Sequence, residues 1–167
     1  MHTIELESMA IEMPAVGEHP NRQAFHGVLT RVDVPSDRAP AGARGHRVVL
    51  TRVAAEGALG SLLGMALDYS PSLDRHDARR KVGIITRAEV VGRQIELGGY
   101  LFAKDFPEIV SKIAKPQAGL GMSYEITDAR IADMRAQVWT LTKVTFTGAA
   151  ILRRDKAAYQ DTWIELD

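Results

Sequence analysis

The stretch KVGIITRAEVVGRQIELGGYLFA, residues 81–103, decides the fold class. Its two halves, KVGIITRAEV (81–90) and QIELGGYLFA (94–103), are apolar and rich in β-branched residues, and Val91-Gly92-Arg93 separates them. Two β-type runs joined by a short connection that contains glycine predict a β-hairpin. The sequence is therefore expected to form a structure built mainly of antiparallel strands.

Further β-type runs lie on both sides of this hairpin. The run FHGVLTRVDV (25–34) alternates valines with polar residues, which is the period of a strand with one buried face. The other predicted strands are HRVVLTRV (46–53), LGMSYEI (120–126), AQVWTLTKVTF (136–146) and the start of ILRRDKAAY (151–159), which is expected to run into a helix. Short helices are predicted at 59–66 and after Asp105, where Pro107 lies in the first turn. Polar loops are predicted at 35–45 and 70–80.

These elements predict an α+β, β-rich fold, namely a closed or partly open β-barrel of about seven strands with a few short helices. A parallel βαβ fold is disfavoured because the strands seldom alternate with full-length helices. The 167 residues suffice for one domain. We expect an N-terminal arm or edge strand at 1–23, a single barrel domain at 24–160 and a C-terminal tail at 161–167.

The composition of the chain argues against several classes of function. The 21 basic and 21 acidic residues cancel, which argues against nonspecific binding of nucleic acid. No apolar run approaches the roughly 18–20 residues of a membrane span, and the acidic N-terminus does not resemble a secretory signal. The chain has no cysteine, so disulfides and thiolate metal sites are excluded and a cytosolic location is the default expectation.

Two polar residues are candidates for chemistry. Ser123 lies in GLGMSYE, where glycines permit a close backbone approach, and its two neighbours would point to the opposite face of an extended strand. His76 lies in DRHD, where nearby carboxylates can fix its tautomer. Each also fits an ordinary turn or a solvated loop. No second group of histidines or carboxylates has metal-ligand spacing, and no nucleotide-binding fingerprint is present, so no metal or cofactor is expected.

Taken in order, these segments resemble the tailed-phage prohead maturation proteases, which share the fold of herpesvirus assemblins. The similarity rests on His76 followed by Val82-Gly83, on Gly121-Met122-Ser123-Tyr124, on Val144-Thr145-Phe146-Thr147-Gly148 and on Arg153-Arg154. It covers roughly residues 25–160. The motifs are short and degenerate, so their order and spacing carry the resemblance.

The resemblance implies a role for each site residue. Ser123 would be the nucleophile and His76 the general base. Arg153 and Arg154 would stabilise the oxyanion, although a basic surface pair explains them equally well. The third member is open, because no histidine follows His76. The alternatives are Thr145, from the spacing to the arginines, and the carboxylates Asp105 and Glu125, of which Asp105 also suits a helix N-cap.

The resemblance also implies a biological setting. A serine endopeptidase of this class would cleave scaffold and capsid protein segments inside an assembling phage procapsid, in the host cytoplasm. Its partners would be those protein substrates, without nucleic acid or membrane, and homo-oligomer formation is left open. The alternative is a noncatalytic β-barrel virion or scaffold-associated module with the same fold. The missing second histidine and the neutral charge are compatible with that alternative.

Overall fold

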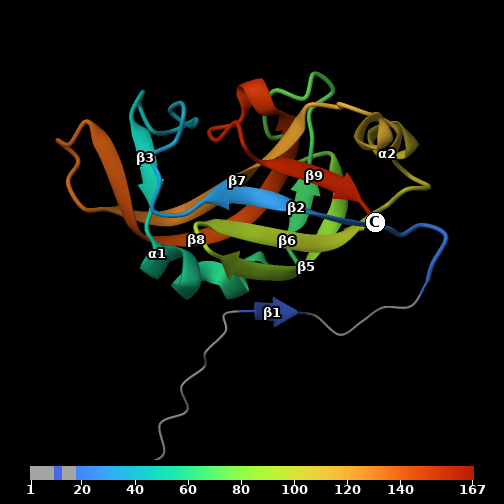
Figure 1. The fold of residues 1–167 in the computed structure, drawn as a ribbon, viewed down its shortest axis with the longest axis horizontal. Helices are drawn as coiled ribbons and strands as arrows, with labels where there is room; N and C mark the ends of the chain where they lie inside the picture. Colours follow the sequence, from blue (N-terminus) through green and yellow to red (C-terminus); the bar gives the residue numbers. More distant parts are fainter. Residues whose placement is uncertain (1–9, 13–17) are drawn as a thin grey trace, which may run out of the picture.

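A curled, mixed β-sheet organises the chain in the computed structural model, which describes residues 10–12 and 18–167 (Figure 1). Seven strands follow one another in the order β3-β8-β4-β5-β6-β2-β9, while β1 pairs with β5 and β7 pairs with β8. The strands are β1 (Ala10–Glu12), β2 (Gln23–Arg31), β3 (Arg47–Leu50), β4 (Ala66–Asp68), β5 (Lys81–Val91), β6 (Gln94–Leu101), β7 (Leu120–Ile131), β8 (Val138–Arg153) and β9 (Trp163–Leu166). The prediction of a β-rich α+β fold is confirmed as a half-barrel of seven strands with short helices.

The central hairpin forms as predicted. Strands β5 and β6 pair antiparallel, Val91 opposite Gln94, and Gly92 in the connection has a φ of +57°. A positive φ is the left-handed conformation that glycine adopts without steric cost. On the other side of β6, β2 pairs antiparallel along its length.

The helices cap the sheet. Helix α1 (Arg52–Ala58) packs against β8, followed by the 3₁₀ turn η1 (Leu59–Leu62), and α2 (Pro107–Ala114) lies beside β9 (Figure 1). The sequence placed residues 51–53 in a strand and began a helix only at residue 59. The helix begins earlier because the Thr51 hydroxyl accepts a hydrogen bond from the backbone N–H of Ala54, which caps the first turn.

Segments near both ends of the chain, in the predicted arm and tail, form strands of the sheet. Residues 163–166 form β9, which pairs antiparallel with β2, so they are part of the sheet and not a tail. Within the predicted arm, residues 10–12 form β1 against β5, whereas residues 1–9 and 13–17 lie outside the described residues. The run at 151–159 ends as a strand at Arg153 and continues into a short 3₁₀ turn, η2 (Arg154–Lys156).

The curl brings the two ends of the sheet together. Strand β7 packs against β2 and β9 without pairing with either. One hydrogen bond joins this seam, from the backbone N–H of Met122 to the hydroxyl of Thr162, 3.1 Å away. Both residues are almost fully buried. The concave side of the sheet is filled by large apolar side chains such as Phe25, Leu97 and Phe146.

No helix among the described residues is long and apolar enough to cross a membrane.

Candidate active site

A row of three residues crosses the outer face of the sheet. On β8, Ala150 pairs with Asp68 of β4 on one side and with Ser123 of β7 on the other. Residues in register on neighbouring strands point to the same face, and strands lie about 4.8 Å apart, so the Cα atoms of Asp68 and Ser123 are about 10 Å apart. The side chain of Ala150 between them is small and fully buried.

The side chain of Ser123 points to this outer face. Its neighbours point inward, since Met122 is buried and the Tyr124 ring packs edge-on against Phe146 in the core. The predicted alternation around Ser123 is therefore confirmed. Ser123 is half-buried, and its hydroxyl makes no hydrogen bond within the described part of the chain, so it is unengaged.

His76 reaches the same face from the loop between β4 and β5. This loop folds back over the sheet, and it is fixed by a hydrogen bond from the Asp77 N–H to Asp68 Oδ1 (3.0 Å) and by one from the Arg153 N–H to the Leu73 carbonyl (2.8 Å). The prediction of a polar loop at 70–80 is confirmed, and its folding back is what brings the histidine over the strands.

The imidazole of His76 lies between two carboxylates. Its Nδ1 atom is 3.5 Å from Asp68 Oδ2 and 3.6 Å from Glu125 Oε2. Because Asp68 is on β4 and Glu125 is on β7, the ring lies over β8, the strand between them. Nδ1 is buried and has no hydrogen-bond partner among the described residues. The ring as a whole stays about a quarter exposed, with 27% of the side chain accessible.

The two carboxylates differ in their surroundings. Asp68 is buried, with 8% of its side chain exposed, and its other oxygen accepts the Asp77 N–H. Glu125 is 49% exposed, and its other oxygen accepts a hydrogen bond from the Thr147 hydroxyl at 3.0 Å. Each carboxylate is therefore held through one oxygen and presents the second to His76.

The aspartates beside His76 hold the loop and do not contact the ring. Hydrogen bonds from Ser72 and Ser70 lower the pKa of Asp74, and the hydrogen bond from Arg79 lowers the pKa of Asp77. Both side chains thus stay ionised and anchored to their own loop. The carboxylates that face the His76 ring are therefore those of Asp68 and Glu125, and not those of its neighbours in DRHD.

The three candidates for the third member have different positions. Glu125 contacts His76 directly. Asp105 does not, because its carboxylate accepts a hydrogen bond from the Asn21 side chain (2.8 Å). Asp105 is not an N-cap either, since α2 begins after Phe106 without a side-chain cap. Thr145 pairs with Thr127, and it is Thr147, two residues further along, that bonds to Glu125.

Asp68 is the site residue that the sequence did not indicate. It ends a strand of three residues, which is too short to show a period. Its partner residue on β8, Ala150, follows more than 80 residues later, so no local pattern relates Asp68 to Ser123. A buried carboxylate after an apolar residue, in the text ALDYS, is the only local signal.

The arginine pair, at the end of β8 and the start of η2, lies beside the first residue of β7. Arg153 pairs with Leu120, three residues from Ser123, and its guanidinium contacts Asp155 at 3.3 Å. Arg154 donates from Nε to the carbonyl of Leu120 (3.2 Å). Three residues of strand span about 10 Å. Both arginines therefore lie beside the first residues of β7, the half of the strand that also holds Ser123. Neither arginine contacts Ser123 directly.

The same cluster has the composition of a metal site. One ligand atom from each of Asp68, His76 and Glu125 lies within 4.8 Å of the other two. The sequence offered no ligand-spaced group because the three residues come from β4, a loop and β7. A grouping of this kind therefore became visible only in three dimensions.

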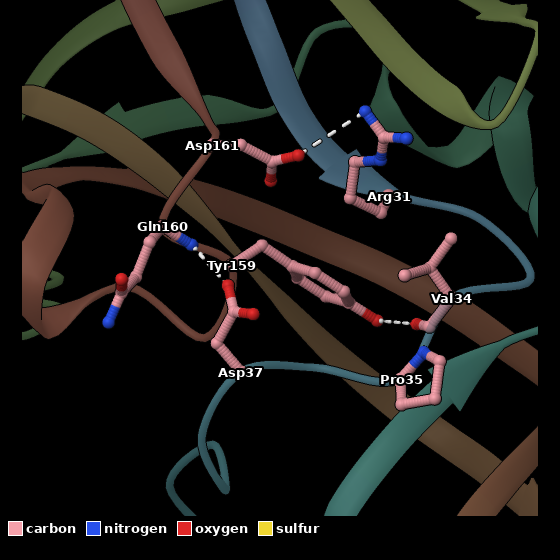
Figure 2. A pocket seen from close by; sticks show the side chains of 7 residues that line it. All are labelled: Arg31, Val34, Pro35, Asp37, Tyr159, Gln160 and Asp161. Carbon is pink, nitrogen blue, oxygen red and sulfur yellow. Dashed lines mark hydrogen bonds and ion pairs between the residues drawn. The ribbon is translucent and has the colours of Figure 1, made fainter.

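A separate hollow of about 350 Å³ opens between the end of β2 and the segment before β9 (Figure 2). In it, Arg31 pairs with Asp161 at 3.3 Å, and the Tyr159 hydroxyl donates to the Val34 carbonyl at 2.8 Å. Asp37 accepts the Gln160 N–H. Among these lining residues, Arg31 Nε is buried without a hydrogen-bond partner within residues 10–12 and 18–167. None of the residues lining the hollow belongs to the His76 cluster.

No protein-family model matches the chain, and no curated protein sequence matches it significantly. The function must therefore be argued from the site itself.

Proposed function

We propose that this chain is a serine endopeptidase of the prohead maturation class, with an assemblin-like fold. It acts through an acyl-enzyme on Ser123, with His76 as the general base. Its substrates are segments of scaffold and capsid proteins, met inside an assembling procapsid in the host cytoplasm. One observation carries the proposal: His76 lies over the face of the sheet from which Ser123 projects, and its Nδ1 faces two carboxylates.

The tautomer follows from this placement. A carboxylate beside Nδ1 favours a proton on that nitrogen, which leaves the lone pair on Nε2. Nε2 can then accept the Ser123 proton as the hydroxyl oxygen attacks a peptide carbonyl. The protonated imidazole gives this proton to the leaving amine, and a water molecule hydrolyses the ester by the same route in reverse. In the absence of substrate, catalytic hydrogen bonds are often long, so an unengaged Ser123 hydroxyl is compatible with this role.

Asp68 and Glu125 serve as positioning residues in this scheme. Asp68 is the stronger candidate for orienting the ring because it is buried and its second oxygen is fixed by a backbone N–H. The negative charge also stabilises the imidazolium that forms during acylation. Glu125 adds a second charge from the solvent side. Arg153 and Arg154 supply cations near the start of β7 for the developing oxyanion, through water or after a side-chain movement.

A fluorophosphonate probe tests the nucleophile directly. It reacts with an activated serine and adds its phosphonyl group, which the intact mass of the protein reports. We expect one adduct on the wild-type protein, mapped by peptide mass to Ser123, and none on Ser123→Ala. Ser111→Ala is the matched control, since Ser111 is exposed on α2 and outside the cluster.

The absence of an adduct on a folded wild-type protein would contradict the proposal and favour the noncatalytic module. A second experiment addresses the substrate class. Ser123→Ala should stop scaffold and capsid processing in procapsids while the variant still folds and is incorporated. Normal processing in procapsids that contain only this variant would exclude Ser123 as the nucleophile.

A further inference from the structure

We propose that Asp68, His76 and Glu125 form a binding site for a divalent first-row transition ion such as Zn²⁺, and that the bound ion switches off acyl transfer. The binding is argued from the geometry of the cluster alone. The inhibition rests on the proposed function.

Two of the three separations between the ligand atoms fit a tetrahedral ion. Zn²⁺ lies about 2.0–2.1 Å from imidazole nitrogen and carboxylate oxygen, so two of its ligands are about 3.4 Å apart at a tetrahedral angle. His76 Nδ1 is 3.5 Å from Asp68 Oδ2 and 3.6 Å from Glu125 Oε2. These distances are too long for good hydrogen bonds and close to the edge of a coordination tetrahedron. All three atoms lie within 4.8 Å of one another.

A second observation is the burial of the same nitrogen. His76 Nδ1 is a buried nitrogen without a hydrogen-bond partner in the described part of the chain. Buried polar atoms normally have a partner, and an unsatisfied one calls for an explanation such as an ion. The nitrogen is aimed at the two carboxylate oxygens. A cation between the three atoms would satisfy it and would also neutralise the two negative charges.

Hydrogen bonds from neighbouring groups hold both carboxylate ligands in place. The ligand oxygen of Asp68 is oriented by the Asp77 N–H on the other oxygen, and that of Glu125 by the Thr147 hydroxyl. Hydrogen bonds of this kind fix metal ligands and are commonly worth 10–100-fold in affinity. Asp68 is almost fully buried, whereas Glu125 is half-exposed, so an ion can enter from the solvent side. Three protein ligands leave a fourth position for water.

The imidazole explains why the ion must inhibit. A neutral imidazole has one N–H and one lone pair. If Nδ1 gives its lone pair to the ion, the proton must be on Nε2, which can no longer accept the proton of Ser123. The two carboxylates, once they coordinate the ion, also no longer stabilise a protonated imidazole. Metal binding and general-base catalysis therefore exclude each other at His76.

The donor set indicates the class of ion. Imidazole favours zinc and its neighbours in the first transition row, while Mg²⁺ and Ca²⁺ prefer sites made only of oxygen ligands. We therefore expect Zn²⁺ to bind and Mg²⁺, at a hundredfold higher concentration, not to displace it.

Isothermal titration of the metal-free protein with ZnCl₂ tests the binding. We expect one ion per chain and at least a tenfold weaker Kd for Glu125→Gln, with a loss of about 10-fold for Thr147→Val. Both substitutions are on the exposed side of the site, so both variants are expected to fold. Circular dichroism checks that they do. His46→Gln is the control for adventitious histidine binding, because His46 stacks on Trp139, which lies near the opposite end of β8 from Ala150. Equal affinity of Glu125→Gln and wild type, or no binding at all, would overturn the site.

Fluorophosphonate labelling with and without Zn²⁺ tests the inhibition separately. We expect saturating Zn²⁺ to slow labelling of Ser123 at least tenfold and EDTA to restore the rate. Unchanged labelling with Zn²⁺ bound would overturn the inhibition. If Zn²⁺ binds and no labelling occurs under any condition, the metal site stands and the proposed peptidase activity fails.

Discussion

The substitution Gly121→Ala should break the seam that closes the curled sheet. A Cβ atom on Gly121 would lie 2.4 Å from Thr162 Oγ1 and 3.1 Å from the Thr162 carbonyl oxygen. The first distance is shorter than real Cβ contacts, so the Thr162 side chain must move. That hydroxyl accepts the buried Met122 N–H and donates to the Tyr159 carbonyl, each at 3.1 Å.

The magnitude follows from these two bonds. A buried N–H left without a partner costs about 1–3 kcal/mol, and the lost hydroxyl bond adds about 0.5–1.5 kcal/mol. We expect Gly121→Ala to lower the free energy of unfolding by about 2–4 kcal/mol. Urea unfolding followed by tryptophan fluorescence measures it, since Trp163 is on β9 beside the seam. The m-value should stay constant if both states keep their compactness.

Two further variants test whether the clash with Thr162 causes the loss of stability. Gly57→Ala, in α1, meets no atom within 4 Å and should stabilise the protein by about 0.5–1 kcal/mol. Thr162→Ala removes the clashing hydroxyl, so Gly121→Ala should cost clearly less in that background than alone. Full additivity of Gly121→Ala and Thr162→Ala, or a loss below about 1 kcal/mol for the single variant, would refute the proposed cause.

Two other predictions concern a buried tyrosine and the positioning carboxylate. Burial raises the pKa of Tyr159 above its ordinary value near 10, so the folded state retains the phenol proton and stability is lost as pH rises above about 10, by up to about 1.4 kcal/mol per pH unit. At pH 8, Tyr159→Phe should have a lower free energy of unfolding than the wild type, because the substitution removes the hydrogen bond of the Tyr159 hydroxyl. Above about pH 10, its free energy of unfolding should fall less steeply with pH than that of the wild type. Equal slopes for the two proteins in unfolding experiments would contradict this prediction. Asp68→Asn should slow fluorophosphonate labelling by about 10²–10⁴-fold at an equal folded fraction, whereas Asp105→Asn should label at the wild-type rate. Equal rates for the two variants would remove Asp68 from the mechanism.

The sequence predicted those parts of the fold that have a local signal. The hairpin at 81–103 has alternating β-type runs and a glycine connection, and both strands form. The alternation around Ser123 is likewise a property of neighbouring residues. The early start of α1 has a local signal, the cap at Thr51, which the prediction of a strand over 46–53 did not use.

The parts that were missed depend on distant contacts. Strands β4 and β9 have three and four residues, and each is a strand only because a long partner pairs with it. Asp68 becomes a site residue through that pairing. Among the third-member alternatives, the spacing to the arginines favours Thr145, and the carboxylate that the resemblance implies favours Asp105 and Glu125. The pairing of β7 with β8 brings Glu125, one of these alternatives, beside Thr147 and His76.

The register of β8 also determines when the site can exist during synthesis. Asp68 and Ser123 are aligned through Ala150, so the candidate positioning residue and the candidate nucleophile are both synthesised before the strand that aligns them. Pairings between residues so far apart in sequence form slowly and late in folding. A ribosome-bound chain that ends before residue 138 therefore holds His76 and Ser123 without holding them together. The proposed peptidase activity therefore requires the complete sheet, so a nascent chain would cleave neither itself nor its neighbours.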